Sequence, residues 1–80
     1  MKEGALEAQY YEIRLEGELG KRWEDWFGGM QISHPEENQT LLAGWLPDQA
    51  ALHGVLFKVR DLRLVLISVI RIDRPVPGEK

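Results

Sequence analysis

Apolar and polar side chains alternate near the N-terminus, and a period of two is typical of a β-strand with one buried face. In residues 10–16, Tyr11, Ile13 and Leu15 fall on one face, and the charged residues between them fall on the other. Gly17 follows directly and interrupts the pattern. The sequence therefore predicts a half-buried strand that ends at Gly17.

A second alternating stretch, residues 30–33, and a third predicted strand, residues 40–45, are separated by a short polar segment. That segment includes Pro35, whose backbone nitrogen carries no hydrogen and cannot extend a ladder. Strands separated by so few residues pair as a hairpin. We expect Trp45 to point inward and Leu42 to lie on the outer face of the sheet.

Apolar residues recur at helical spacing between residues 19 and 27. Gly28 and Gly29 end this segment, because glycine adopts left-handed dihedral angles without steric cost. The pattern predicts a short helix over residues 19–27, with an aromatic face packed on the sheet. That face consists of Leu19, Trp23, Trp26 and Phe27.

The clearest helical pattern lies between residues 48 and 62. Asp48 is suited to the N-cap position, where a carboxylate accepts hydrogen bonds from free amides. Arg63 occupies the place where a helix end usually carries glycine, at a small local cost. The apolar stripe of this helix comprises Ala51, Leu52, Val55, Leu56, Val59 and Leu62.

The last predicted strand, residues 64–72, is aliphatic on both faces. Simple alternation directs Val65, Ile67 and Val69 toward the core. An edge strand with one wet face would alternate with polar residues, and this strand does not. The side chains left on the open side of the sheet are Leu64, Leu66, Ile70 and Ile72.

These elements follow one another in the order β-α-β-β-α-β. With right-handed crossovers, this order predicts an α+β, ferredoxin-like fold. Its four-stranded antiparallel sheet has the strand order 4-1-3-2, and both helices cover one face. We expect one domain over residues 9–73, a frayed N-terminus over residues 1–8 and a flexible C-terminal tail over residues 74–80.

Composition and charge exclude several classes of protein. The chain has 80 residues, enough for one small domain. A net charge of -3 argues against nucleic acid as the main partner, and no apolar run is long enough to span a membrane. The chain has no cysteine, which excludes disulfides and thiolate metal sites. No secretory signal is recognisable near the N-terminus, so we expect a cytoplasmic protein.

Five short stretches have a distinctive composition: Tyr11–Arg14, Arg22–Trp23, Trp26–Phe27, Asp48–Gly54 and Arg60–Leu62. Through them, residues 10–72 resemble a group of small, uncharacterised bacterial α/β proteins. The resemblance implies the same small α/β fold and implies no activity. Other members tend to carry glycine where this chain has Arg63, so only the detail of that helix end differs.

Candidate catalytic chemistry is sparse. His34 and His53 are the only histidines, and Phe57 stands one helical turn after His53, where a second metal ligand would be needed. The acidic residues fall in a turn or on a solvated strand face. We therefore expect no catalytic residue, no metal site and no cofactor, in a protein that is not an enzyme.

The apolar outer side of the last strand is the strongest functional signal, because a large exposed apolar area usually marks an interaction surface. We expect a non-enzymatic protein-interaction or assembly module. It would be a homodimer, held by the strand over residues 64–72 or by the open sheet face, with a different protein as the next choice of partner. The expected interface residues are Leu42, Leu64, Leu66, Ile70, Ile72 and, on the second helix, Phe57.

The alternative is a small-ligand or anion-binding domain, or a weak enzyme of the dimeric α/β-barrel type. Its pocket would lie between a helix and the sheet and would be lined by Trp23, Trp45 and His34. A ligand pocket needs polar groups that converge among apolar ones, and the sequence offers few of them.

Overall fold

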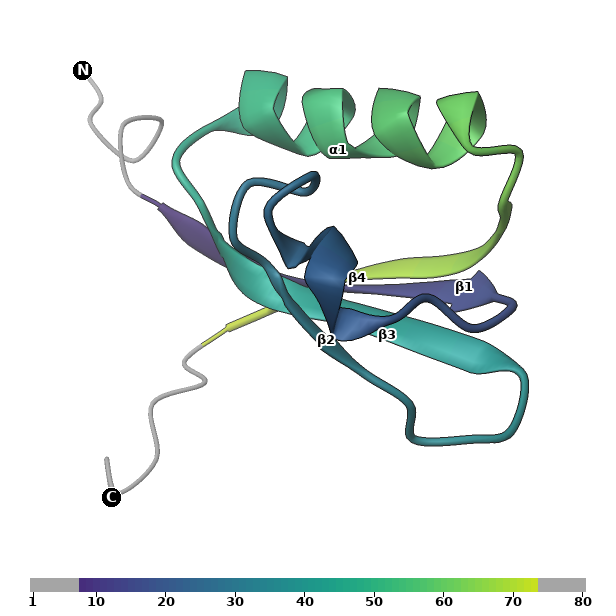
Figure 1. The fold of residues 1–80 in the computed structure, drawn as a ribbon. Helices are drawn as coiled ribbons and strands as arrows, with labels where there is room; N and C mark the ends of the chain where they lie inside the picture. Colours follow the sequence, from purple (N-terminus) through teal and green to yellow (C-terminus); the bar gives the residue numbers. More distant parts are fainter. Residues whose placement is uncertain (1–7, 74–80) are drawn as a thin grey trace, which may run out of the picture.

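The structure, a computed structural model, describes residues 8–73. Residues 1–7 and 74–80, which belong to the predicted frayed N-terminus and flexible tail, lie outside the described residues. In chain order the elements (Figure 1) are β1 (Gln9–Glu16), the 3₁₀-helix η2 (Lys21–Glu24), β2 (Gln31–Ser33), β3 (Gln39–Leu46), α1 (Gln49–Asp61) and β4 (Val65–Ile72).

The four strands form one antiparallel sheet in the order β2-β3-β1-β4, which read from the β4 edge is β4-β1-β3-β2. β1 and β3 pair along their full length, from Gln9 opposite Leu46 to Glu16 opposite Gln39. β2 adds only a three-residue strand beside β3. An α+β fold with a four-stranded antiparallel sheet is therefore confirmed.

The structure has one α-helix within residues 8–73, where the sequence predicts two. Residues 21–24 form a 3₁₀-helix, in which Trp23 N–H donates to the Gly20 carbonyl at 3.1 Å, and turns follow as far as Gly29. The segment between Gly20 and Gly28 is too short to offset the cost of starting an α-helix. Gly20 also has no side chain to cap it. The predicted ferredoxin-like layer of two helices is therefore wrong.

Two side chains connect this irregular segment to the rest of the fold. The Glu24 carboxylate accepts a hydrogen bond from the backbone amide of Ile32 in β2, at 2.9 Å. Phe27 is buried in the core, whereas Trp26 is exposed and meets Trp23 edge to face, with 6.2 Å between ring centroids. The predicted aromatic face is thus divided between the core and the surface.

α1 begins where its sequence predicts. Asp48 is the N-cap residue, and its side chain accepts a hydrogen bond from the backbone amide of Ala51 at 2.8 Å. The helix is followed by Arg63, which has a φ of 61°, in the left-handed region that favours glycine. The Asp48 side chain therefore fixes the start of the helix, and a left-handed residue follows its end.

The core lies between α1 and the face of the sheet formed by β1, β2 and β3. From α1, the buried residues are Leu52, Val55 and Val59. β4 contributes no fully buried residue. The sheet and the segment before β2 supply Tyr11, Ile13, Leu15, Phe27, Met30, Ile32, Leu42 and Leu46.

Candidate interaction surface

β4 is an edge strand whose side chains are largely exposed. β1 is its only neighbour in the sheet, so within residues 8–73 its outer backbone groups have no strand partner. Five of its aliphatic side chains are between 36% and 57% exposed, and we call them the β4 patch: Val65, Leu66, Ile67, Val69 and Ile70.

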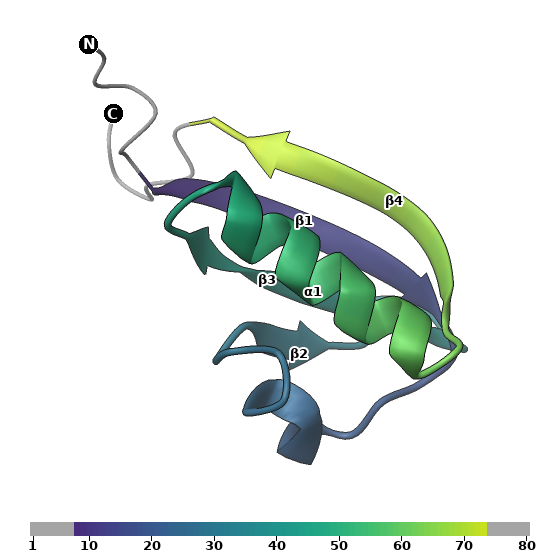
Figure 2. The ribbon, with the colours of Figure 1, turned by 90° about the horizontal axis from the view of Figure 1, so that it is seen from above.

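The exposure of β4 follows from the position of α1. The helix lies over β1 and β3, and β4 runs beside it (Figure 2). The segment over residues 19–27, which the sequence also predicts as a helix, packs next to β2 instead. Neither element covers β4, and this explains why Leu66 and Val69 are exposed although they share the helix side of the sheet with the core.

A β-bulge decides which way the residues of β4 face. Arg14 of β1 pairs with Ser68, but the next β1 residue, Leu15, pairs with Leu66, so Ile67 is an extra residue in β4. Leu15 is buried on the helix side. Because partners across a ladder share a face, Leu66 lies on that side as well.

Because of the bulge, some side chains of β4 lie on the face opposite to the one that simple alternation predicts. Val69 pairs with a buried residue of β1 and lies on the helix side, whereas Ile70 pairs with Glu12 on the open face. Val65 pairs with Glu16 and also lies on the open face. The predicted placement of Leu66 on the open face and of Val65 toward the core is therefore wrong, because the extra residue inverts the alternation of the N-terminal half of β4.

Among the other predicted interface residues, Leu42 and Leu64 lie elsewhere than expected, whereas Ile72 lies on the open face as predicted. Leu42 is 0% exposed, on the helix side of β3, so its predicted place on the outer face is wrong. Leu64 is partly buried against the core. Ile72 is the open-face partner of Tyr10 and is partly buried. We therefore centre the candidate surface on the β4 patch, which includes three residues (Val65, Ile67 and Val69) that the sequence assigns to the core.

The open face of the sheet is apolar at one end and charged along its middle. At the apolar end Trp45 is 56% exposed, and its ring meets Tyr10 edge to face with 5.3 Å between centroids. The prediction that Trp45 points inward is wrong. Along β1 the same face carries the charged column of Glu12, Arg14 and Glu16, which lies between β3 and β4.

Phe57 projects from α1 and is 55% exposed. The guanidinium carbon of Arg60 lies 5.1 Å from the centroid of its ring, in a cation–π contact. Phe57 belongs to a different element from the β4 patch, so it stands as a single exposed aromatic residue. Single apolar side chains at a surface need no partner.

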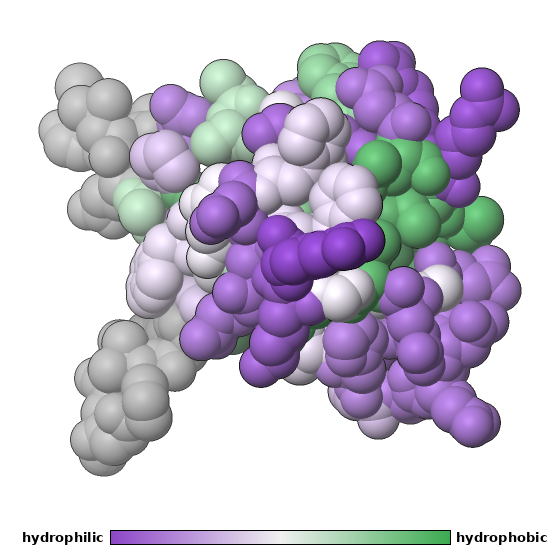
Figure 3. Space-filling model, viewed as in Figure 1, coloured by the Kyte–Doolittle hydropathy of each residue, from purple (hydrophilic) through white to green (hydrophobic). Residues whose placement is uncertain are grey.

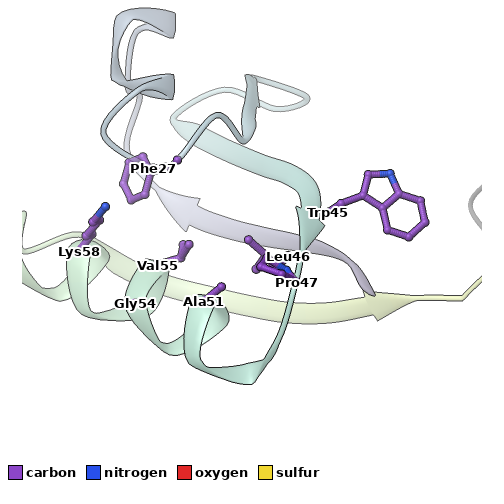
Figure 4. Close-up of a pocket in the computed structure, with 9 residues that line it drawn as sticks. Phe27, Trp45, Leu46, Pro47, Ala51, Gly54, Val55 and Lys58 are labelled. Carbon is purple, nitrogen blue, oxygen red and sulfur yellow. The ribbon is translucent and has the colours of Figure 1, made fainter. Parts of the chain in front are cut away.

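A groove of about 320 Å³ lies between α1, the end of β3 and the segment before β2 (Figure 4). Phe27, Leu46 and Val55 contribute apolar surface to it. Lys58 stands at one end, and Trp45 lies at the other with its ring pointing away. The groove is therefore mostly apolar.

The groove does not unite the residues predicted to line a pocket. Trp45 touches its rim, but Trp23 packs against the core, and His34 hydrogen-bonds through Nε2 to a backbone carbonyl 2.6 Å away in the loop after β1. The one charged lining residue, Lys58, already donates through Nζ to the carbonyl of Trp26 at 2.8 Å. Convergent polar groups, which fix a ligand in place, are thus few.

Titratable residues do not gather into a site in the part of the chain that the structure describes. No group of three His, Cys, Asp or Glu side chains there is arranged to hold a metal ion. His53 lies exposed on α1. Within the same residues, no helix combines the length and the apolar character needed to cross a membrane. The β4 patch remains the candidate functional feature.

The opposite side of the molecule has a different surface. Figure 3 shows the side on which β2 lies, where polar residues dominate and apolar residues gather mainly beneath the C-terminal end of α1. β4 runs at the far side in this view, as Figures 1 and 2 together show. The two edges of the sheet therefore differ, with a short strand at one and a long aliphatic strand at the other.

The fold and the exposed edge define a small α+β domain with one helix on a four-stranded antiparallel sheet. The chain belongs to the family described as Domain of unknown function (DUF8691), whose model matches residues 10–70. That range includes the whole β4 patch. No curated protein and no solved structure matches the chain.

Proposed function

We propose that this protein is a non-enzymatic interaction and assembly module that works as a homodimer, with β4 as its interface. The observation that carries the proposal is the β4 patch, five aliphatic side chains exposed on both sides of an edge strand. Natural edge strands are usually protected by charges, by proline, by short length or by a β-bulge, and of these the stretch Val65–Ile70 has only the bulge at Ile67. β4 has eight residues, and Val65 to Ile70 contain neither a charge nor a proline.

A second copy of the chain is the partner that this edge fits best. An antiparallel pair of identical strands satisfies the outer backbone groups of both copies through one two-fold contact. A chain of 80 residues also buries a modest share of its surface alone. Pairing would bury aliphatic side chains at the β4 edge of the sheet, which α1 does not cover.

The edge supports this contact better than the open face does. On the open face, the charged column of Glu12, Arg14 and Glu16 stands between β4 and the aromatic pair. Packing two such faces together would remove these charges from water, which costs free energy unless every charge is paired. Edge pairing leaves the charged column solvated.

Light scattering after size exclusion tests the homodimer. At tens of micromolar, we expect the wild type to have about twice the 9.2 kDa mass of one chain. Leu66→Glu and Ile70→Glu each replace an aliphatic side chain of β4 by a carboxylate, and we expect both variants to be monomers because the contact of that side chain with the aliphatic residues of the partner strand is lost. Both side chains are exposed, so the folded monomer can accept the substitution.

Glu12→Gln is the matched control, because Glu12 is the β1 partner of Ile70 but belongs to the column that edge pairing leaves in water. Its mass should equal that of the wild type. Circular dichroism should show the same fold for every variant. A wild type that elutes as a 9.2 kDa species at tens of micromolar contradicts the homodimer. The β4 edge would then be left to pair with a strand of another protein.

A further inference from the structure

We infer that the two copies pair β4 with β4 about a two-fold axis that passes between Ile67 and Ser68. The inference rests on the proposed homodimer and specifies its register. In this register Leu66 of one copy lies opposite Val69 of the other, on the helix side of the sheet. The β-bulge determines which face of the sheet each residue of β4 occupies.

Opposing residues in an antiparallel ladder share a face of the sheet. In a regular strand, residues on one face are an even number of positions apart, so a two-fold axis must pass through a residue. In the regular part of β4, residues 68–72, an axis at Ile70 would place Ser68 opposite Ile72. That register leaves the N-terminal half of the β4 patch without a partner.

The bulge permits a register that a regular strand does not. Leu66 and Val69 both lie on the helix side although they are three positions apart, and Val65 and Ile70 both lie on the open face although they are five positions apart. These odd separations arise because the extra residue, Ile67, lies between the members of each pair. An axis immediately C-terminal to Ile67 brings both pairs together at once.

An axis immediately N-terminal to Ile67 would also match the faces, but it would oppose unlike residues. It would set Ile70 opposite Arg63 and Val65 opposite Ser68. Aliphatic side chains stabilise a ladder when they face one another, and they lose that contact opposite a charged or small polar residue. The axis between Ile67 and Ser68 also sets Ile67 opposite a serine, but the other four residues of the β4 patch then face aliphatic residues, Leu66 with Val69 and Val65 with Ile70.

This register also limits the assembly to two copies. An axis perpendicular to the sheet joins the two sheets into one and places both α1 helices on the same side. It uses the β4 edge of each copy completely. Within residues 8–73, the edges that remain are the two β2 strands, which have three residues each and offer little backbone for further pairing.

Cysteine cross-linking reads the register, and the chain has no cysteine of its own. Leu66→Cys and Val69→Cys are mixed in equal amounts, unfolded, refolded together and oxidised. Directly opposed residues have Cα atoms about 4.5–5.5 Å apart, within reach of a disulfide. Random pairing of the two variants makes half of the dimers heterodimeric. We therefore expect a cross-linked dimer on a non-reducing gel, in up to half of the sample.

Each single variant is the control for the mixture. In the inferred register, the two copies of Leu66→Cys carry their thiols three residues, or about 10 Å, apart along the strands, too far for a disulfide. The same holds for Val69→Cys alone. Self-cross-linking of Val69→Cys or of Ile70→Cys would place the axis on that residue and overturn the inference. Cross-linking of mixed Val65→Cys and Ser68→Cys would place it on the other side of Ile67.

Light scattering of the same refolded samples separates this inference from the proposed function. A dimer that shows no cross-link in the Leu66→Cys and Val69→Cys mixture overturns the register and leaves the homodimer intact. A monomer overturns both. A cross-link that appears in the mixture and in neither single variant supports the axis between Ile67 and Ser68.

Discussion

Thr40 is a fully buried polar residue whose hydroxyl group joins β3 to the loop after β1. Its Oγ1 donates a hydrogen bond to the Gly17 carbonyl at 2.7 Å and accepts one from the Leu19 amide at 2.9 Å. One side chain thus satisfies two backbone groups where the chain leaves the sheet. It fixes the path of the segment that leads to η2.

We expect Thr40→Val to lower the free energy of unfolding by about 1–3 kcal/mol, because it keeps the shape of the side chain and leaves the Gly17 carbonyl and the Leu19 amide without their partner. Urea denaturation measures the change. Thr40→Ser keeps the hydroxyl group, so hydrogen exchange at the Leu19 amide should be faster in Thr40→Val and nearly unchanged in Thr40→Ser. Equal protection of that amide in the two variants would contradict the assigned role.

The direction of side chains in β3 depends on a contact that the local pattern does not contain. Most of the strand is apolar on both faces, so alternation alone does not choose its phase. In the structure Gly44 faces Met30, and an added Cβ would lie 3.4 Å from the Met30 Cα. Gly44 therefore lies on the inner side of β3, opposite the buried Tyr11 of β1, and this phase puts Trp45 outside and Leu42 in the core.

At the scale of the element, the end of α1 is a Schellman motif with arginine in the position that usually holds glycine. The Leu64 amide donates to the Val59 carbonyl at 3.2 Å, and the Arg63 amide donates to the Arg60 carbonyl at 2.9 Å. Leu64 packs against the core beside the helix end. The motif therefore holds Arg63 at its φ of 61° despite the steric cost to a residue with a Cβ.

We expect Arg63→Gly to raise the free energy of unfolding by about 0.5–1 kcal/mol, because relief of the left-handed strain exceeds the added entropy of glycine in the unfolded chain. Chemical denaturation measures the difference. Arg63→Ala is the control, since it removes the same charge and keeps a Cβ in the strained conformation. A gain of equal size in both variants would assign the effect to charge and contradict the backbone explanation.

The elements with strong local signals are those that the sequence predicts well. α1 follows from the Asp48 cap and the apolar stripe, and β1 follows from its alternation. The segment over residues 19–27 has a helical pattern, but it is bounded by glycines and too short to nucleate an α-helix. The bulge at Ile67 is a property of the pairing between β4 and β1, so the sequence of β4 alone predicts an aliphatic strand and assigns the wrong face to Val65 and Leu66.

At the scale of the whole molecule, the core is one-sided. α1 covers the centre of the sheet, and the edge strand β4 contributes aliphatic residues to the surface instead of to the core. A homodimer would convert that surface into buried area, so part of the stability of the fold would come from association. Stability that comes from association depends on protein concentration by mass action.

We therefore expect the melting temperature of the wild type to rise by about 3–6 °C for each tenfold increase in protein concentration, once the concentration exceeds that needed for pairing. Scanning calorimetry across the micromolar range measures this slope. Glu12→Gln should keep it, because Glu12 lies outside the edge contact. Leu66→Glu should melt at one temperature at every concentration, since a monomer has no association term. If the melting temperature of the wild type is as independent of concentration as that of Leu66→Glu, the folded monomer tolerates its exposed β4 patch in water. The β4 edge would then contribute nothing to stability through association.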